Sequence, residues 1–310
     1  MNSTKRFLTA LGISVAVVAP GVAATGTAAQ ADITFPPACG EVRDTTATAS
    51  APGFEVKLCG VTDVDQLRVD LIGNGNTHCG PATVYNTLNY IGKKHNLPIT
   101  MGPNGTPMNQ TNPASAAGFD ATTAWLGWLG LAAGQGWDGG STSMYGNRKS
   151  FDEATAKARA AGHQFARGQI DTADTPEFGH ELAKKLSYAP VQMVFGRYSM
   201  TNTNAWKRTG GHFVTVVQAK GSIGTGKVEL LVHDPAAAPD HGTTGYLETQ
   251  SPYRLETITL ERKTVLVTGT DAEGDIIFAY RTVWELTGPS YGGTKFVEAL
   301  NWYAYLPPVG

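Results

Sequence analysis

The chain has 310 residues, of which 24 are basic, 26 are acidic and 41% are hydrophobic. This nearly neutral charge balance gives no electrostatic basis for binding nucleic acid or an anionic membrane. Aromatic and β-branched residues run along the whole length, while charged residues are sparse and Gly, Thr, Ala and Asn are abundant. That composition is typical of a loop-rich globular protein and excludes a disordered chain.

The first residues have the features of an export signal. Lys5 and Arg6 form a short positive start, an apolar stretch follows, and Ala-Gln-Ala at 29–31 has the small-x-small pattern that signal peptidase recognises. We expect residues 1–31 to be a signal peptide cleaved before Asp32, giving a secreted, extracellular protein with a net charge of −4 instead of −2. A retained membrane anchor is the alternative, but two glycines and a proline interrupt the apolar stretch, and no later stretch is long and apolar enough to span.

The chain contains three cysteines, so an exported protein would close one disulfide and keep one thiol. Cys39 and Cys59 lie in glycine-flanked, loop-like segments. We expect them to pair and to fasten an N-terminal extension, residues 32–75, made of short strands and turns. Cys79 then remains free. Taken alone, it is also consistent with a small buried apolar residue, or with pairing to one of the others.

Cys79 lies where the pattern changes to a helix. Apolar residues at i, i+4 and i+7 predict a helix from Cys79 to about Asn96, with Asn76 or Thr77 as its N-cap. The positive end of the helix dipole and its unpaired N–H groups favour a thiolate there. The same amides can donate to an oxyanion that forms beside the sulfur.

Helical periodicity also predicts helices near residues 116–133, 151–161 and 176–186, joined by loops rich in Gly, Pro and Asn. Alternating patterns then predict strands at 190–195, 212–219, 227–233, 254–261, 264–268, 275–285 and 295–305. Helices first and strands later, without regular alternation, predict an α+β fold with one domain over residues 76–310.

Two polar residues are associated with predicted strands. His212 begins an apolar strand after Gly210 and Gly211, at a position where Val or Ile would pack better and where the glycines leave space. Asp234 follows another strand, which Pro235 ends, so its carboxylate is placed to accept from an imidazole N–H. Each also has an ordinary interpretation, either a half-buried histidine with its hydrogen bonds satisfied or an Asp-Pro that starts a turn.

Three short motifs together resemble a known family. They are Cys79-Gly80-Pro81-Ala82, Gly211-His212-Phe213 and Asp234-Pro235-Ala236, in the order found in papain-like cysteine peptidases. The resemblance is closest to the branch of bacteriocin-leader (double-glycine) processing peptidases and their secreted relatives, and it covers about half of the mature chain in separate pieces. It implies a papain-like fold, in which the helix carrying the nucleophile packs on an antiparallel β-sheet. Here a β-rich C-terminal extension would follow.

The resemblance also implies an activity, that of a cysteine peptidase that hydrolyses amide bonds through a thioester. Cys79 would be the nucleophile, His212 the general base and Asp234 the group that orients the base. The expected substrate is a peptide or protein, and no cofactor is expected. The family usually has a Gln six residues before the nucleophile; here that position is Gly73, and Asn74 is the chosen oxyanion donor, although a turn also explains an Asn there.

Two alternatives remain open. The same three side chains are suited to a transglutaminase-like acyl transfer to an amine, or to an amidase that cleaves a cell-wall or side-chain amide. A secreted binding module that keeps the fold without activity is the second alternative. His163, His180, His233 and His241, with Asp240, fit no zinc spacing, so no metal site is expected. Of these, His233 is the next choice of base after His212.

Overall fold

The computed structural model describes residues 39–101, 105–113, 115–136, 140–172, 175–236, 255–270 and 276–308. All of them belong to a compact unit that spans Ile33–Gly310. The expected signal peptide and the pair Asp240 and His241 lie outside the described residues. Among the residues that the structure describes, no helix is both long and apolar enough to cross a membrane.

The helices largely follow the predicted pattern, with different ends. In the described ranges they are α1 (Cys79–Lys94), α2 (Ala116–Ala132), α3 (Met144–Ala160) and α4 (Phe178–Leu186), with short 3-10 segments η1 (Ile72–Gly75) and η2 (Met108–Gln110). The α1 N-cap residue is His78, without a side-chain capping bond, so the expected cap at Asn76 or Thr77 is wrong. The α3 helix begins seven residues before its predicted start because the Ser143 hydroxyl accepts from the Gly146 N–H and caps it.

The strands within the described residues are β1 (Val42–Asp44), β2 (Gly53–Lys57), β3 (Gln164–Asp171), β4 (Val191–Met200), β5 (Trp206–Ser222), β6 (Lys227–His233), β7 (Glu256–Thr270), β8 (Ile276–Thr287) and β9 (Thr294–Leu306). The two strands predicted between 254 and 268 form the single strand β7, and β3 was not predicted. The buried part of β5 is 212–219, as the apolar run indicated, but the strand begins at Trp206 because residues 206–211 extend the hairpin with β4.

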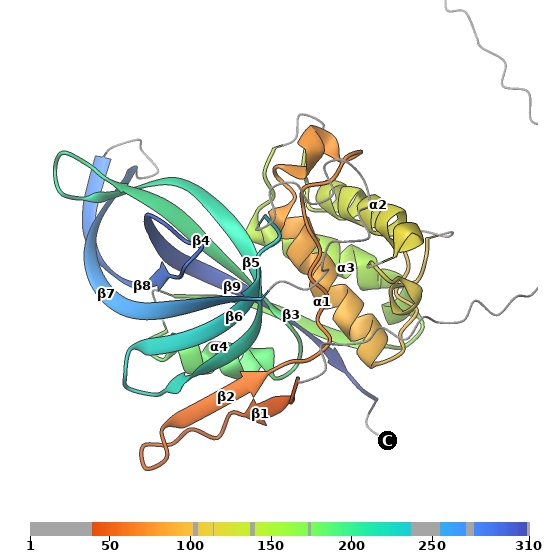
Figure 1. Cartoon of the computed structure of the whole chain (residues 1–310), viewed down its shortest axis with the longest axis horizontal. Helices are drawn as coiled ribbons and strands as arrows, with labels where there is room; N and C mark the ends of the chain where they lie inside the picture. Colours follow the sequence, from red (N-terminus) through yellow and green to blue (C-terminus); the bar gives the residue numbers. More distant parts are fainter. Residues whose placement is uncertain are drawn as a thin grey trace, which may run out of the picture. The chain divides into compact units, whose positions relative to one another are not determined.

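The described strands β4 to β9 form a closed antiparallel ring. Each pairs with the next along the chain, and β9 pairs back with β4. The sheet continues outward from β5 through β2 to β1, and from β9 to β3. Figure 1 shows the curved strands on one side and α1, α2 and α3 grouped on the other, with α4 close to β5 and β2. The predicted α+β class with an antiparallel sheet is therefore confirmed.

Helix α1 is the central helix of the fold. Its residues from Gly80 to Gly92 are all buried, because α2 and α3 cover one side and β4 and β5 cover another. Polar side chains fix it to the sheet: Asn86 Nδ2 donates to Thr215 Oγ1 at 3.0 Å, and Thr87 Oγ1 donates to the Pro190 carbonyl at 3.2 Å. Such buried bonds hold the middle of the helix at a defined place against the sheet.

The expected disulfide is present. Cys39 and Cys59 are bonded, and Cys79 is free. The bond joins the start of the described chain to the loop that follows β2, and Leu58 in this loop is tied to β5 through a bond from its N–H to the Val217 carbonyl at 2.9 Å. The disulfide therefore closes a loop within the N-terminal extension, and backbone pairing with β5 fastens the extension to the rest of the sheet.

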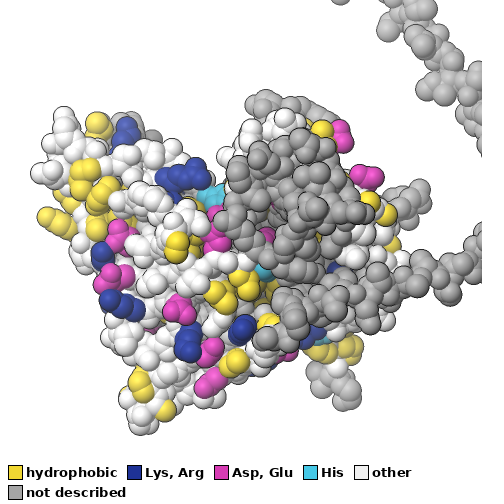
Figure 2. Space-filling model, in the orientation of Figure 1, with side chains coloured by type: hydrophobic (Ala, Val, Ile, Leu, Met, Phe, Trp, Pro, Cys, Tyr) yellow, Lys and Arg dark blue, Asp and Glu magenta, His cyan; other side chains and the backbone are white. Residues whose placement is uncertain are grey.

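The surface of the strand region carries charges of both signs. Figure 2 shows Lys, Arg, Asp and Glu side chains interspersed over this face, as the nearly neutral composition indicated. Hydrophobic side chains gather toward the end of the β7–β8 hairpin, where Ile276, Phe278 and Tyr280 are more than half exposed. That end of the hairpin therefore lies outside the core.

Candidate active site

Cys79 is the first residue of α1, and its side chain is partly buried. The backbone N–H groups of Gly80 and Phe213 donate to its sulfur, and so does the His212 side chain. The carbonyl of Gly80 accepts from Thr83 Oγ1 at 2.7 Å and from Gln192 Nε2, on β4, at 3.1 Å. The sulfur therefore lies at the positive end of α1, in a turn that the sheet holds in place.

His212 lies at the start of the buried part of β5. Its partner in the β4–β5 register is Phe195, whose ring packs edge-on against the imidazole with centroids 5.5 Å apart. The imidazole Nε2 is 2.6 Å from Asp234 Oδ1. Since Nε2 is used in that bond, Nδ1 is the nitrogen left for the hydrogen bond with Cys79.

Asp234 directly follows β6, at the strand end where the alternation predicted it. Besides the His212 ring, the backbone N–H of Ala236 donates to Oδ1 at 2.9 Å. The hydroxyl of Tyr291, in the loop between β8 and β9, donates to Oδ2 at 2.7 Å. Both carboxylate oxygens thus accept hydrogen bonds from the protein, and the side chain is only 10% exposed.

The three groups shift each other's pKa values toward a charged state. Burial opposes ionisation of all three, but hydrogen bonds and opposite charges outweigh it. The hydrogen bonds to Asp234 and Cys79 raise the pKa of His212 to about 9. The bond to His212 lowers the pKa of the Cys79 thiol and that of Asp234 below their ordinary values. The arrangement therefore favours a thiolate, an imidazolium and a carboxylate in a row, which is suited to nucleophilic catalysis.

Asn74, the predicted oxyanion donor, lies in η1 and is exposed. Both Asn74 and Gly73 have left-handed backbone angles, with φ of +50° and +59°. Asn tolerates this region better than most side chains, so the turn itself accounts for the residue. Within the described residues the Asn74 side chain has no hydrogen-bond partner. A role for its amide in the reaction stays a prediction.

Gly80 is required for the close packing of α1 against α3. It is buried, and a β-carbon there would lie 2.3 Å from Thr142 Oγ1 and 2.5 Å from Asn147 Nδ2. These side chains come from α3 and the segment before it, so the close approach of α1 and α3 excludes any larger residue directly after Cys79. Gly210, in contrast, faces open space.

Gln66 connects the two sides of the site and was not found from the sequence. Its N–H donates to the Pro235 carbonyl at 2.9 Å, next to Asp234. Its side-chain amide donates to the carbonyls of Gly75 and Asn76, both at 3.1 Å, in the loop that leads to Cys79. A polar residue in a loop carries no signal of such contacts, because they depend on how distant segments meet.

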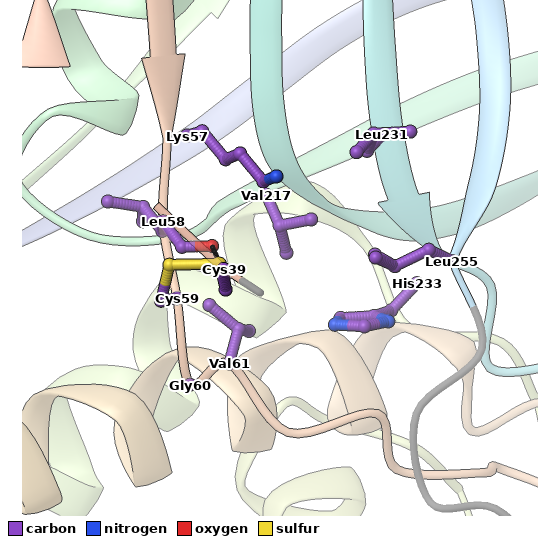
Figure 3. Close-up of a pocket in the computed structure, with 10 residues that line it drawn as sticks. All are labelled: Cys39, Lys57, Leu58, Cys59, Gly60, Val61, Val217, Leu231, His233 and Leu255. Carbon is purple, nitrogen blue, oxygen red and sulfur yellow. Dashed lines mark hydrogen bonds between the residues drawn. A yellow bond between two sulfur atoms is a disulfide. The ribbon is translucent and has the colours of Figure 1, made fainter. Parts of the chain in front are cut away.

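His233, the alternative base, points to the other side of β6. Its Nδ1 is 3.4 Å from Asp63 Oδ2, and its ring lines a pocket together with the disulfide (Figure 3). The pocket is lined by Cys39, Lys57, Leu58, Cys59, Gly60, Val61, Val217, Leu231, His233 and Leu255. None of the three predicted catalytic residues lines it, and His212 is the histidine that the structure brings to Cys79.

The described residues contain no group of three or more His, Cys, Asp or Glu side chains that could hold a metal ion. Comparisons with protein-family models, with curated proteins and with solved structures find no match to this chain. The functional assignment therefore depends on the geometry of Cys79, His212 and Asp234.

Proposed function

We propose that this protein is a secreted, papain-like cysteine peptidase that hydrolyses amide bonds of a peptide or protein through a thioester. The observation that carries the proposal is the 2.6 Å hydrogen bond between His212 and Asp234, together with the interaction of the same imidazole with the Cys79 thiol. The three residues come from α1, β5 and the end of β6, which are far apart in the sequence. Core packing alone gives no reason to bury a thiol, an imidazole and a carboxylate in line.

The architecture supports the papain-like assignment. The nucleophile begins the central helix. The base lies on β5 and the orienting carboxylate directly follows the neighbouring strand β6, in an antiparallel sheet that packs against this helix. This is the arrangement that the three motifs imply. The disulfide between Cys39 and Cys59 agrees with an extracellular protein, because such bonds persist in oxidising compartments.

The proposed mechanism follows from the charges. The Cys79 thiolate attacks the carbonyl carbon of the scissile amide, and the backbone N–H at the start of α1 stabilises the oxyanion. Imidazolium His212 then gives its proton to the leaving amine, and the thioester forms as the C–N bond breaks. A water molecule, deprotonated by His212, hydrolyses the thioester, while Asp234 keeps the ring oriented and stabilises its positive charge.

Alkylation by iodoacetamide tests the proposal without knowledge of the substrate. At about pH 6 an ordinary thiol is almost fully protonated and reacts slowly. We expect mass spectrometry of the unreduced protein to show rapid labelling of Cys79, and at least tenfold slower labelling in His212→Ala. His163→Ala is the matched control, because His163 contacts Tyr305 and not the thiol. Slow labelling of the wild-type protein at this pH would reject the proposal.

A second measurement is needed to show whether water or an amine accepts the acyl group. A peptidase releases the free acid when a peptide library is digested, even in the presence of millimolar amine. Formation of amine adducts as the main product would instead identify the transglutaminase-like alternative. Release of an amide-linked group from a cell-wall fragment, with no peptide cleaved, would identify an amidase.

A further inference from the structure

We propose that Tyr291 is a positioning residue of this site: its hydroxyl holds the Asp234 carboxylate in the orientation that faces His212. The inference extends the proposed function and rests on it. The hydroxyl is 2.7 Å from Asp234 Oδ2, the oxygen that does not contact the imidazole. Tyr291 would thus act through Asp234 and would not touch the substrate.

The position of the Tyr291 ring is defined on several sides. Its backbone N–H closes a turn onto the Gly288 carbonyl at 3.0 Å. The ring packs edge-on against Phe195, with centroids 5.8 Å apart, and Phe195 in turn packs against the His212 ring. The Phe195 ring therefore packs against both the Tyr291 ring and the His212 ring. This contact fixes the Tyr291 ring, so its hydroxyl is directed to a fixed point.

Asp234 has no other donor for this oxygen among the described residues. Oδ1 accepts from both His212 and the Ala236 N–H, whereas Oδ2 accepts from Tyr291. The side chain is nearly buried, so loss of the hydroxyl would leave Oδ2 without a partner in a site of low polarity. The carboxylate would then gain by rotating toward solvent, away from the imidazole.

Other charged groups face the tyrosine. The Glu256 side chain, at the start of β7, also contacts the hydroxyl, and the Lys295 ammonium lies 5.9 Å from the ring centroid. Burial, followed by the negative charges of Asp234 and Glu256, raises the pKa of Tyr291 far above its ordinary value. Tyr291 therefore keeps its proton over the whole working pH range and remains a donor.

The test measures the rate of Cys79 alkylation by iodoacetamide from about pH 4 to about pH 11. The wild-type profile should have two steps, a lower one where the thiolate–imidazolium pair forms and an upper one near 9 where His212 loses its proton. In Tyr291→Phe we expect the upper step to move about one pH unit lower. The ring stays in place in this variant, and an unchanged melting temperature within a few degrees verifies the fold.

Tyr198→Phe is the matched control. The Tyr198 hydroxyl also donates to a carboxylate, that of Glu298 at 3.0 Å, which has no contact with the three residues of the site. Its removal should leave both steps unchanged. In the Asp234→Asn background, Tyr291→Phe should add no further shift, because its effect passes through the carboxylate. If Tyr291 had only a structural role, Tyr291→Phe would shift the upper step equally in the wild-type and the Asp234→Asn backgrounds.

The outcomes separate this inference from the proposed function. Two steps in the wild type with an unmoved upper step in Tyr291→Phe would overturn the role of Tyr291 and leave the proposed function standing. A single wild-type step at the pKa of an ordinary thiol would overturn both, since no imidazolium would be there to orient.

Discussion

The side-chain amide of Asn147 lies directly against the Cα of Gly80, so that a β-carbon on residue 80 would be 2.5 Å from Nδ2 and 2.7 Å from Oδ1. The residue that follows Cys79 is thus set by the approach of α3 to the start of α1. Asn147 is fully buried and cannot move away without disturbing the helix it belongs to.

The first prediction follows from this contact. Gly80→Ala should lower the free energy of unfolding by about 1–3 kcal/mol, because buried overpacking forces side chains or backbone to shift. Denaturation by urea measures the change. Gly53→Ala is the control, since a β-carbon there meets nothing within 4 Å and should cost less than about 1 kcal/mol. Equal stabilities of the two variants would show that α3 adapts to the extra methyl group.

Local patterns were sufficient for part of the fold. The start of α1 at Cys79, the buried run 212–219 and the end of β6 before Asp234 each have a signal within a few residues. The start of α3 had none, because Ser143 caps the helix inside a glycine-rich segment that composition assigns to a loop. Sequence periodicity reports only on residues that are close together along the chain, so it predicts elements with a local signal and not the start of α3.

The parts of the site that the sequence did not predict depend on contacts between segments that are far apart along the chain. Tyr291 meets Asp234 across 57 residues, and only because β8 and β9 bring their connecting loop to the end of β6. A tyrosine in a glycine-rich loop is equally compatible with an exposed turn. The same applies to Gln66, whose partners are backbone carbonyls and leave no trace in the sequence.

The pH dependence of activity is the second prediction. Catalysis needs the thiolate and the imidazolium together, so activity is lost as the pH falls through the lowered pKa of Cys79. It is lost again as the pH rises through the pKa of His212, about 9. We expect a bell-shaped profile of kcat/KM whose upper limb lies near pH 9. An upper limb at the ordinary histidine pKa, about 6.5, would show that the ring is not stabilised as a cation.

The third prediction concerns Gln66. Gln66→Ala leaves the Gly75 and Asn76 carbonyls without their side-chain donor, so the free energy of unfolding should fall by about 1–3 kcal/mol. Because that loop leads to Cys79, kcat/KM should also fall. Gln218→Ala is the control: its amide donates to Glu55 on β2, and activity should be unchanged. A stable but inactive Gln66→Ala protein would assign Gln66 a part in the reaction itself.

The disulfide is the subject of the fourth prediction. Replacement of both Cys39 and Cys59 by Ser should lower the free energy of unfolding by about 3 kcal/mol, because the bond closes a loop of about 20 residues in the unfolded chain. The rate of Cys79 alkylation in the folded protein should not change, since its hydrogen bonds come from Gly80, His212 and Phe213. A change in that rate would mean that the extension also shapes the site.

The last prediction separates the roles of the three central residues. Cys79→Ala and His212→Ala should each abolish hydrolysis of a peptide library, whereas Asp234→Asn should retain a measurable remnant. The thiol and the imidazole make and break bonds, while the carboxylate only orients and stabilises the ring. In Asp234→Asn the amide oxygen still accepts from the Ala236 N–H when it takes the place of Oδ1, and the NH2 group in the place of Oδ2 donates to the Tyr291 hydroxyl oxygen, which favours a folded protein.

The nucleophile and the base act as a unit, so the Cys79→Ala/His212→Ala double variant should cost little more than either single substitution. Circular dichroism and melting temperatures should verify that all four proteins are folded. Near-normal activity in His212→Ala, on a substrate that Cys79→Ala does not cleave, would identify a different base. Because His233 faces Asp63 on the other side of β6, that result would also require a rearrangement of the strand end that carries Asp234.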